Sequence, residues 1–483
     1  MTKSTLHHLL KLLAGPLIAL TCWLVNPFHL NELANNTISI GAWMIVWWIL
    51  ESIPMPAVAL MPLLMFPILK ISTIEKTAQA YSNPVIFLFM GGFMIGLAIE
   101  KWHLHKRMAL HIIRLTGTSG KQIILGFILA CGFLSMWLSN TATTMMMFPI
   151  ALSVINVLKA HEPPGKNMDN FSLVLMLVIA YASNIGGMAT IIGTPPNVAF
   201  AAYIEKTYHY NIQFSEWILL CLPLAIVLLL AIYGVLAYWL FPVNIRHSED
   251  ASLFVQQELS ALGPMSKAER LVLVIFCFTA LMWISKDLLN QVLPVSLDDT
   301  QIALIGALAL FIFPSGDISG KSDRLLEWSD TSKMAWGILL LFGGGIALAS
   351  ALESAGIVQK IGTGLAGFSG NNTFLLVLTI VTLSVFLSEL MSNVAQVIVF
   401  APVLGSLADA LHINPLLLGI PMTLAASAAA MLPMGTPPNA IVFGSGHIPL
   451  KKMIKAGFAV NLVCILAITL FCFYFLPYIM SNN

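Results

Sequence analysis

Charged residues are scarce in this sequence: Asp, Glu, Lys and Arg make up 9% of its 483 residues, whereas hydrophobic residues make up 58%. Soluble domains carry about 25% charged residues, so this composition excludes an ordinary soluble protein. The formal net charge is only +1, which argues against nucleic acid as a partner, because that partner requires a basic face. The composition instead indicates a protein that lies in a lipid bilayer.

Paired cysteines and enzyme motifs are also missing. The six cysteines lie singly in or beside apolar runs, with no CxxC pair, so we interpret them as buried hydrophobic residues. The sequence contains no HExxH, GxSxG or GxxxxGK[ST] motif. We therefore expect no enzymatic activity and no zinc, disulfide or nucleotide chemistry.

Long apolar runs dominate what is present. Stretches of about 18 or more apolar residues recur, long enough to cross a hydrocarbon core ~30 Å thick as helices. They predict an all-α integral membrane protein with about eleven transmembrane helices and two re-entrant hairpins. The predicted spans lie near 11–30, 38–53, 55–69, 84–100, 172–202, 215–241, 270–289, 299–313, 334–352, 416–442 and 456–479, and the hairpins near 121–158 and 372–408.

Basic residues fix the predicted orientation. With the N-terminus in the cytoplasm and the C-terminus outside, all but five of the 23 Lys and Arg residues fall on the cytoplasmic side. The five exceptions are Lys70, Lys76, Lys206, Lys286 and Lys360. This bias predicts a multi-pass protein of the inner (plasma) membrane.

The two halves of the sequence repeat one another. An offset of 253 residues carries FMGGFMIGLAIE at 89–100 onto FGGGIALASALE at 342–353, and SNTA at 139–142 onto SNVA at 392–395. An odd number of crossings separates the copies, which predicts the inverted-topology repeat of secondary transporters. The predicted parts are an N-terminal cytoplasmic segment with the first span (1–37), repeat 1 (38–242), a cytoplasmic linker (243–269) and repeat 2 (270–483).

Two consecutive prolines interrupt a helix in each repeat. GTPPN occurs at 193–197 and again at 435–439. Proline lacks a backbone donor and disfavours the helical conformation of the preceding residue, so each helix must break there. Carbonyl ends exposed by such a break suit a dehydrated Na⁺, and helix N-termini suit a carboxylate. The repeat therefore predicts two cation sites with one anion site between them.

Polar residues at membrane depth mark the two hairpins. LSNTATT at 138–144 and MSNVAQV at 391–397 must satisfy their own hydrogen bonds there. Either motif alone is explained by helix capping or helix packing, but their symmetric placement favours ligand binding. No Lys or Arg stands close to these motifs, so a bound dianion needs compensation from cations and helix N-termini.

These four motifs, together with WWILESIPMPAVALMPLLMFP at 47–67 and NPVIFLFMGGFMIGLAIEKWHLHKR at 83–107, resemble the divalent anion sodium symporter family, also called the INDY family. The resemblance covers nearly the whole chain. It implies a homodimer with scaffold and transport domains that works by an elevator mechanism. It also implies sodium-coupled symport of C4-dicarboxylates such as succinate, malate and fumarate, or of citrate.

The resemblance further implies which residues form the site. The first sodium site would consist of Ser135, Ser139, Asn140 and the Gly193 backbone, and the second of Ser388, the Met391 carbonyl, Asn393 and the Gly435 backbone. The substrate would contact Asn140, Thr141, Thr194, Asn393, Val394, Thr436 and Pro437. Val394 replaces the threonine that is commoner in the family, which leaves the choice between C4-dicarboxylate and citrate open.

Other interpretations stay open. A sodium-independent dicarboxylate exchanger would have the same fold, and a related branch of the family carries sulfate with sodium. A channel would need a pore built by repetition around an axis, and a membrane enzyme would need a nucleophile, base or metal set. Glu389, which stands where repeat 1 has Met136, either tunes the neighbouring cation site or pairs internally.

Overall fold

The computed structural model describes residues 3–26, 29–161, 165–245, 249–292, 294, 296–316, 322–357, 359–360, 364 and 372–480. The described residues form helices and connecting turns, with one isolated antiparallel bridge between Pro314 and Arg324 and no strand. The all-α prediction is therefore confirmed.

The helices follow one another in two series that correspond to the two halves of the chain. The first series comprises α1 (Lys3–Val25), α2 (Glu32–Leu50), α3 (Met55–Val58), α4 (Met61–Ile68), α5 (Ile74–Gln79), η1 (Ala80–Ser82), α6 (Pro84–Lys101), α7 (Leu104–Thr116), α8 (Gly120–Ser135), α9 (Asn140–His161), α10 (Lys166–Met188), η2 (Ile191–Gly193), α11 (Pro195–Tyr208), α12 (Phe214–Gly234) and the π-helical turn η3 (Val235–Leu240). The second series comprises α13 (Glu249–Ala261), α14 (Lys267–Ile284), α15 (Lys286–Val292), α16 (Asp299–Ile312), η4 (Trp328–Lys333), α17 (Trp336–Ser354), α19 (Thr373–Ser388), α20 (Asn393–Ala410), α21 (Leu416–Ala426), α22 (Pro437–Phe443) and α23 (Leu450–Met480).

Nine helices in the described part of the chain are long and apolar enough to cross a membrane. They are His8–Val25, Glu32–Leu50, Ile74–Lys101, Asn140–Ala160, Lys166–Met188, Phe214–Leu240, Trp336–Ser354, Asn393–Ala410 and Leu450–Tyr478. Helices α8 and α19 have 16 residues each, about 24 Å at 1.5 Å per residue, which is less than a core of ~30 Å. Each of these short helices is followed after a turn by a longer one, α9 or α20, which is itself among the nine, so the two re-entrant hairpins remain a prediction. The total of eleven crossings remains a prediction.

Two predicted spans are interrupted by local structure. In the segment predicted at 55–69, α3 and α4 are separate short helices, because Pro56 and Pro62 occupy their first turns. The segment predicted at 270–289 bends by 77° between α14 and α15. At this bend the ammonium of Lys286 lies 3.0 Å from the Asp299 carboxylate, and both side chains are buried. The pair explains how a lysine is accommodated inside the protein.

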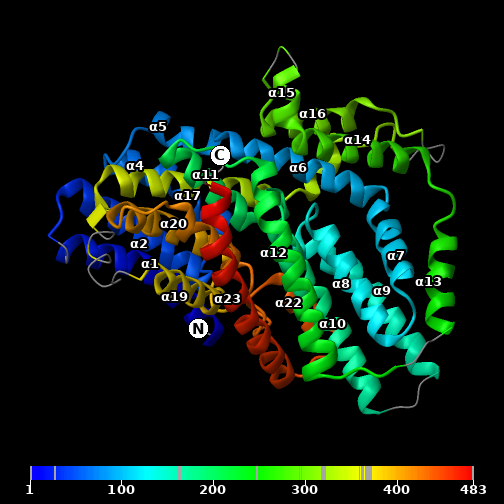
Figure 1. Ribbon diagram of the computed structural model, residues 1–483. Helices are drawn as coiled ribbons and strands as arrows, with labels where there is room; N and C mark the ends of the chain where they lie inside the picture. Colours follow the sequence, from blue (N-terminus) through cyan, green and yellow to red (C-terminus); the bar gives the residue numbers. More distant parts are fainter. Residues whose placement is uncertain are drawn as a thin grey trace.

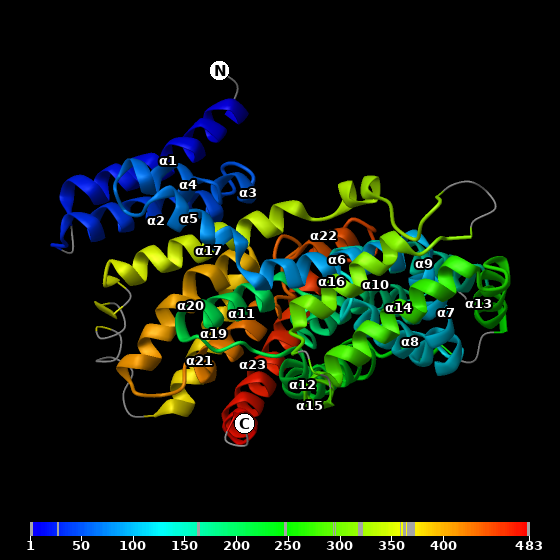
Figure 2. The same cartoon turned by 90° about the horizontal axis from the view of Figure 1, so that it is seen from above.

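The predicted linker 243–269 contains helix α13, which lies at the edge of the molecule in both views (Figures 1 and 2). Ion pairs connect this region to α7. Lys106 pairs with Glu258 of α13 at 2.8 Å, and Arg107 pairs with Glu269 of α14 at 2.6 Å. These charges therefore hold α7 against the segment that joins the two repeats.

Helix α10 runs through the interior of the fold. The N-terminal group α1–α5 lies at the opposite side from α13, and α10 lies between them (Figure 2). Every residue from 170 to 188 is buried. Helix α10 packs against α8 and α9 of its own repeat and against α22 of the other repeat. The two halves of the chain thus meet on this helix.

Candidate substrate and cation site

The two hairpin tips have the same side-chain geometry. At the first tip, Ser135 ends α8 and Asn140 begins α9, and the Ser135 hydroxyl donates to Oδ1 of Asn140 at 2.7 Å. At the second tip, Ser388 ends α19 and Asn393 begins α20, with the equivalent bond at 2.6 Å, and the Ser388 hydroxyl also contacts the Ala426 carbonyl. Both serines are fully buried, whereas both asparagines are partly exposed. Each tip therefore presents one pair of adjacent oxygen atoms.

The broken helices are also fastened in the same way. The last residue of the first GTPPN motif, Asn197, donates from Nδ2 to the carbonyls of Gly187 at 3.2 Å and Thr190 at 2.8 Å. The last residue of the second motif, Asn439, donates to the carbonyls of Ala429 at 3.3 Å and Leu432 at 3.2 Å. These acceptors are equivalent at the 242-residue offset (187 to 429, 190 to 432). The conformation of each break is thus set by its own motif.

Glycines allow the first tip and the first break to touch. A Cβ added at Gly193 would lie 2.6 Å from the Gly187 carbonyl oxygen and 3.0 Å from the Ser135 carbonyl oxygen. A Cβ added at Gly187 would collide with Oδ1 of Asn140. Three of the four residues predicted for the first sodium site, Ser135, Asn140 and Gly193, are therefore brought together around Gly187.

The fourth predicted ligand of the first site has another partner. Ser139 caps α9, since its hydroxyl oxygen accepts a hydrogen bond from the Ala142 amide at 3.2 Å. Thr141 follows in the first turn of α9 and is partly exposed. Thr194 is buried immediately before α11. The hairpin tip and the break thus place their hydroxyl groups on neighbouring helix N-termini.

The second tip carries a buried carboxylate that the first lacks. Oε1 of Glu389 accepts from the amides of Ala430 and Met431 at 2.8 Å, and Oε2 accepts from the Leu432 amide at 2.9 Å. Asn461 of α23 donates to Oε1 at 2.8 Å. Glu389 therefore has internal partners, all of them neutral donors.

Glu389 also stands beside the predicted second sodium site. A Cβ added at Gly435 would lie 2.9 Å from Oε2 of Glu389. Met391 lies in the turn between α19 and α20, Val394 follows Asn393 and is partly exposed, and Pro437 begins α22. Ser388, Glu389 and Gly435 thus line one region of the second half.

A residue that the sequence analysis missed connects the two halves. Asn184 of α10 is buried, and its Oδ1 accepts a hydrogen bond from Nδ2 of Asn140 at 3.4 Å. Its own Nδ2 donates to the Thr436 hydroxyl oxygen of the second break at 3.1 Å. The signal that could have found it is YASNIGG at 181–187, a Ser-Asn pair that precedes two glycines inside an apolar helix.

The gathered groups suit Na⁺. Hydroxyl, side-chain amide and backbone carbonyl oxygens are hard, neutral ligands, and broken membrane helices supply such oxygens to coupling ions in transporters. The buried oxygens Oδ1 of Asn197 and Oδ1 of Asn439 have no hydrogen-bond partner among the described residues. Each half therefore holds more oxygen ligands than its internal hydrogen bonds use.

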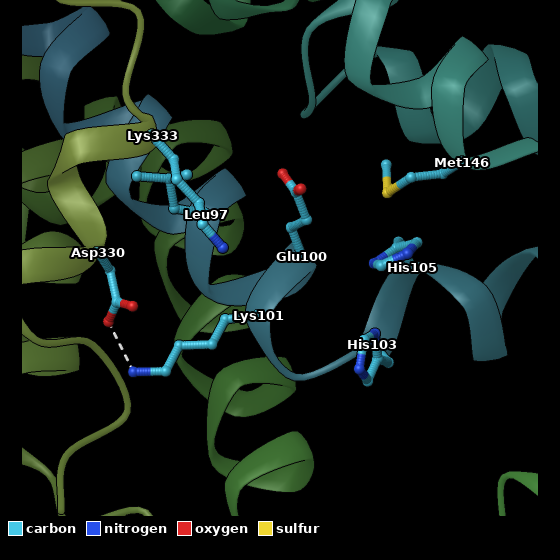
Figure 3. A pocket seen from close by; sticks show the side chains of 8 residues that line it. All are labelled: Leu97, Glu100, Lys101, His103, His105, Met146, Asp330 and Lys333. Carbon is cyan, nitrogen blue, oxygen red and sulfur yellow. Dashed lines mark hydrogen bonds and ion pairs between the residues drawn. The ribbon is translucent and has the colours of Figure 1, made fainter. Parts of the chain in front are cut away.

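A separate cavity of about 320 Å³ lies at the end of α6 (Figure 3). Its lining residues are Leu97, Glu100, Lys101, His103, His105, Met146, Asp330 and Lys333. Lys101 is paired with Asp330 at 2.6 Å. Burial lowers the pKa of His105, and its contact with the Ile99 carbonyl opposes that shift. The cavity contains none of the predicted site residues, and its mixed charges favour neither sign of ligand.

Curated relatives match almost the whole chain. The sequence is 37% identical over 476 residues to a sodium-dependent dicarboxylate transporter, SdcS, of Staphylococcus saprophyticus, covering 97% of this chain and 92% of the relative. It is 38% identical over 482 residues to SdcS of Staphylococcus aureus strain USA300, covering 98% and 92%.

A solved structure shares the fold, and a family model matches nearly the whole sequence. The crystal structure of the Alcanivorax borkumensis YdaH transporter superimposes with a TM-score of 0.60 at 13% identity and covers 83% of this chain and 87% of that one. This likeness concerns the fold alone. The model of the sodium:sulfate symporter transmembrane region matches residues 4–481. The resemblance seen in the motifs is therefore confirmed, and the chain belongs to the sodium:sulfate symporter family.

Proposed function

We propose that this protein is a sodium-coupled symporter of small dicarboxylates and not an enzyme. The observation that carries the proposal is the Ser-Asn oxygen pair, which occurs at equivalent positions in both repeats, Ser135 with Asn140 and Ser388 with Asn393. The relatives SdcS are named as sodium-dependent dicarboxylate transporters. The proposal extends that activity to this chain.

The chemistry of the site supports cation coupling. At the first tip the Ser135 proton lies between two oxygens, and at the second the Ser388 hydroxyl has a further acceptor in the Ala426 carbonyl. In each pair a bound Na⁺ would lie between the two oxygens once the hydroxyl turns its lone pair toward the asparagine oxygen. The amide groups of Asn140 and Asn393 stand at the N-termini of α9 and α20, where the helix dipole favours a carboxylate. Two carboxylates bound in this way need the positive charge that Na⁺ supplies.

Finer features belong to the same proposal. We assign at least two Na⁺ ions, one per repeat, and C4-dicarboxylates such as succinate as substrates. We further assign an elevator mechanism, a homodimer, and a bacterial-type inner membrane location with the N-terminus in the cytoplasm. The inverted repeat supports a transporter that alternates between the two faces of the membrane, and the basic residues on one side of the predicted spans support the orientation. The elevator mechanism and the homodimer rest on the family resemblance alone.

Uptake into proteoliposomes tests the proposed function. Labelled succinate is offered with an inward Na⁺ gradient or with K⁺, to empty vesicles and to vesicles loaded with unlabelled dicarboxylate. We expect uptake into empty vesicles that requires Na⁺. Asn140→Ala and Asn393→Ala should each abolish most of this uptake. Asn170→Ala is the control, because Asn170 donates to the Pro242 carbonyl and is not one of the predicted site residues, and it should leave uptake intact.

Two other outcomes would replace the proposal. Uptake that ignores Na⁺ and requires internal dicarboxylate would identify an exchanger. Sodium-dependent uptake of sulfate without uptake of succinate would identify a sulfate symporter, as the family name suggests.

A further inference from the structure

One buried amide contacts both halves of the site. Asn184 lies on α10 and is 3% exposed. Its Oδ1 faces Nδ2 of Asn140 in repeat 1, and its Nδ2 faces the hydroxyl of Thr436 in repeat 2. An amide oxygen only accepts and an amide nitrogen only donates, so these two contacts have fixed directions.

The contact with Thr436 determines where its proton goes. The Thr436 oxygen accepts from Asn184 at 3.1 Å and from the Asn439 amide at 3.3 Å. A hydroxyl has two acceptor positions and one proton, so both acceptor positions are filled. The hydroxyl can therefore only donate to a further group. Thr436 is buried, and in the hydrogen bonds of the described residues its hydroxyl oxygen accepts twice and does not donate.

The contact with Asn140 leaves an acceptor, and not a donor, facing the site. Since Nδ2 of Asn140 is directed to Asn184, Oδ1 of Asn140 must point to the Ser135 hydroxyl and the first cation site. A flipped Asn140 would place its NH₂ group against the cation instead. The Asn184 amide thus orients Oδ1 of Asn140 as an acceptor for a cation and the Thr436 hydroxyl as a donor to an anion.

From this geometry we infer that Asn184 is a positioning residue for transport: it orients Asn140 toward Na⁺ and Thr436 toward the substrate carboxylate. The inference rests on the proposed function. The equivalent residue in repeat 2 is Ala426 (184 to 426 at the 242-residue offset), so the chain contains this connection once. This orientation of Thr436 favours an anionic substrate, because a hydroxyl that can only donate a hydrogen bond needs an acceptor on the substrate.

Asn184→Asp gives the sharpest test. The aspartate keeps Oδ1 for Asn140 but replaces the donor facing Thr436 by an acceptor, which draws the threonine proton away from the substrate. The half-saturating succinate concentration should rise about tenfold or more, because a hydrogen bond to a charged group is lost. The half-saturating Na⁺ concentration should stay the same or fall, since the first site gains a nearby negative charge.

The experiment also needs Tyr181→Phe, Thr436→Val, and Thr436→Val combined with Asn184→Asp. Tyr181→Phe is the matched control, because Tyr181 donates to the Ala430 carbonyl at 2.7 Å and so also joins α10 to the second break. It should leave both half-saturating concentrations within about twofold. Thr436→Val removes the donor itself, so adding Asn184→Asp to it should raise the succinate value no further.

Asn184→Ala serves if the aspartate variant does not reach the membrane. It frees both neighbours, so both half-saturating concentrations should rise while Tyr181→Phe remains normal. The inference is overturned if Asn184 variants match Tyr181→Phe, or if Asn184→Asp and Thr436→Val add. A wild-type protein without sodium-dependent succinate uptake would instead overturn the proposed function.

Discussion

Glu389 is an anion held inside the protein by neutral hydrogen-bond donors. Three consecutive backbone amides of the second break and the side chain of Asn461 surround it. Hydrogen bonds to a charged group contribute about 1.5–3 kcal/mol each, so this group stabilises the break at the position where a cation is expected. Its charge also favours Na⁺ near Gly435.

We expect Glu389→Gln to weaken sodium binding. Glutamine offers one oxygen, and its NH₂ group would face backbone donors, so the break should loosen while the negative charge is lost. The half-saturating Na⁺ concentration should rise about tenfold, equivalent to ~1.4 kcal/mol, in succinate uptake measured across a Na⁺ series. Asn461→Leu is the matched control: it removes one donor but keeps the charge, so its effect on Na⁺ should be smaller. Equal Na⁺ dependence in both variants and the wild type would contradict this role.

The sequence predicts some site residues better than others. Ser135, Asn140, Ser388 and Asn393 stand out because their motifs recur at one offset, and the structure pairs them within each tip. Asn184 has no such partner, since its contacts depend on how α10 packs between the repeats. A pattern along the chain does not contain that information. A polar residue inside an apolar helix does indicate that a hydrogen-bond partner is present, but not which one.

At the scale of elements, α10 and the first hairpin approach so closely that side chains are excluded. A Cβ added at Gly186 would collide with the carbonyl oxygen of Gly132 on α8. Both partners are backbone, so neither can move without shifting a helix. The position of the first tip therefore depends on this contact.

Gly186→Ala should separate α8 from α10. Overpacking of this kind costs about 1–3 kcal/mol, so the purified protein should melt at a lower temperature and lose sodium-dependent uptake. Gly234→Ala on α12 is the control, because an added Cβ there meets nothing within 4 Å. Wild-type uptake by the Gly186 variant would show that the hairpin tolerates displacement.

Helix interruptions differ in how well they can be predicted. The structure ends α10 at Met188 and begins α11 at Pro195, where GTPPN predicts a break from the chemistry of proline. The 77° bend between α14 and α15 carries no proline or glycine, because the sequence there reads WISKDLL. The ion pair of Lys286 with Asp299 supports that bend, and its partner comes from another helix.

At the scale of the whole molecule, the first hairpin tip contacts α14, which we assign to the scaffold domain of the proposed elevator. The Trp137 ring lies 4.8 Å from the Phe276 ring of α14, measured between centroids. If the hairpins move as an elevator against α14, this contact must break during each transport cycle. The two rings therefore mark a boundary between the proposed domains.

Cross-linking tests that boundary. Cysteines at 137 and 276, joined by a short bifunctional thiol reagent, should stop succinate uptake, and reduction of the link should restore it. Cys22 and Cys277 are first replaced by serine, because the other four cysteines are buried. The control pair replaces Phe374 of α19 and Phe473 of α23, whose rings lie 5.2 Å apart. We assign both of these helices to the moving domain, so their distance should stay constant. Uptake that survives the first cross-link would argue against relative motion at this contact.

The unequal halves of the site also bear on the resting state of the protein. In an inverted repeat with identical halves, exchanging their conformations would turn an inward-open molecule into an outward-open one of the same free energy. Here Glu389 of repeat 2 is equivalent in position to Met136 of repeat 1, and Asn184 of repeat 1 is equivalent to Ala426 of repeat 2. The two open states then differ at their centres, so we expect unequal populations before any ligand binds. Sodium and substrate would act on an equilibrium that the chain has already biased.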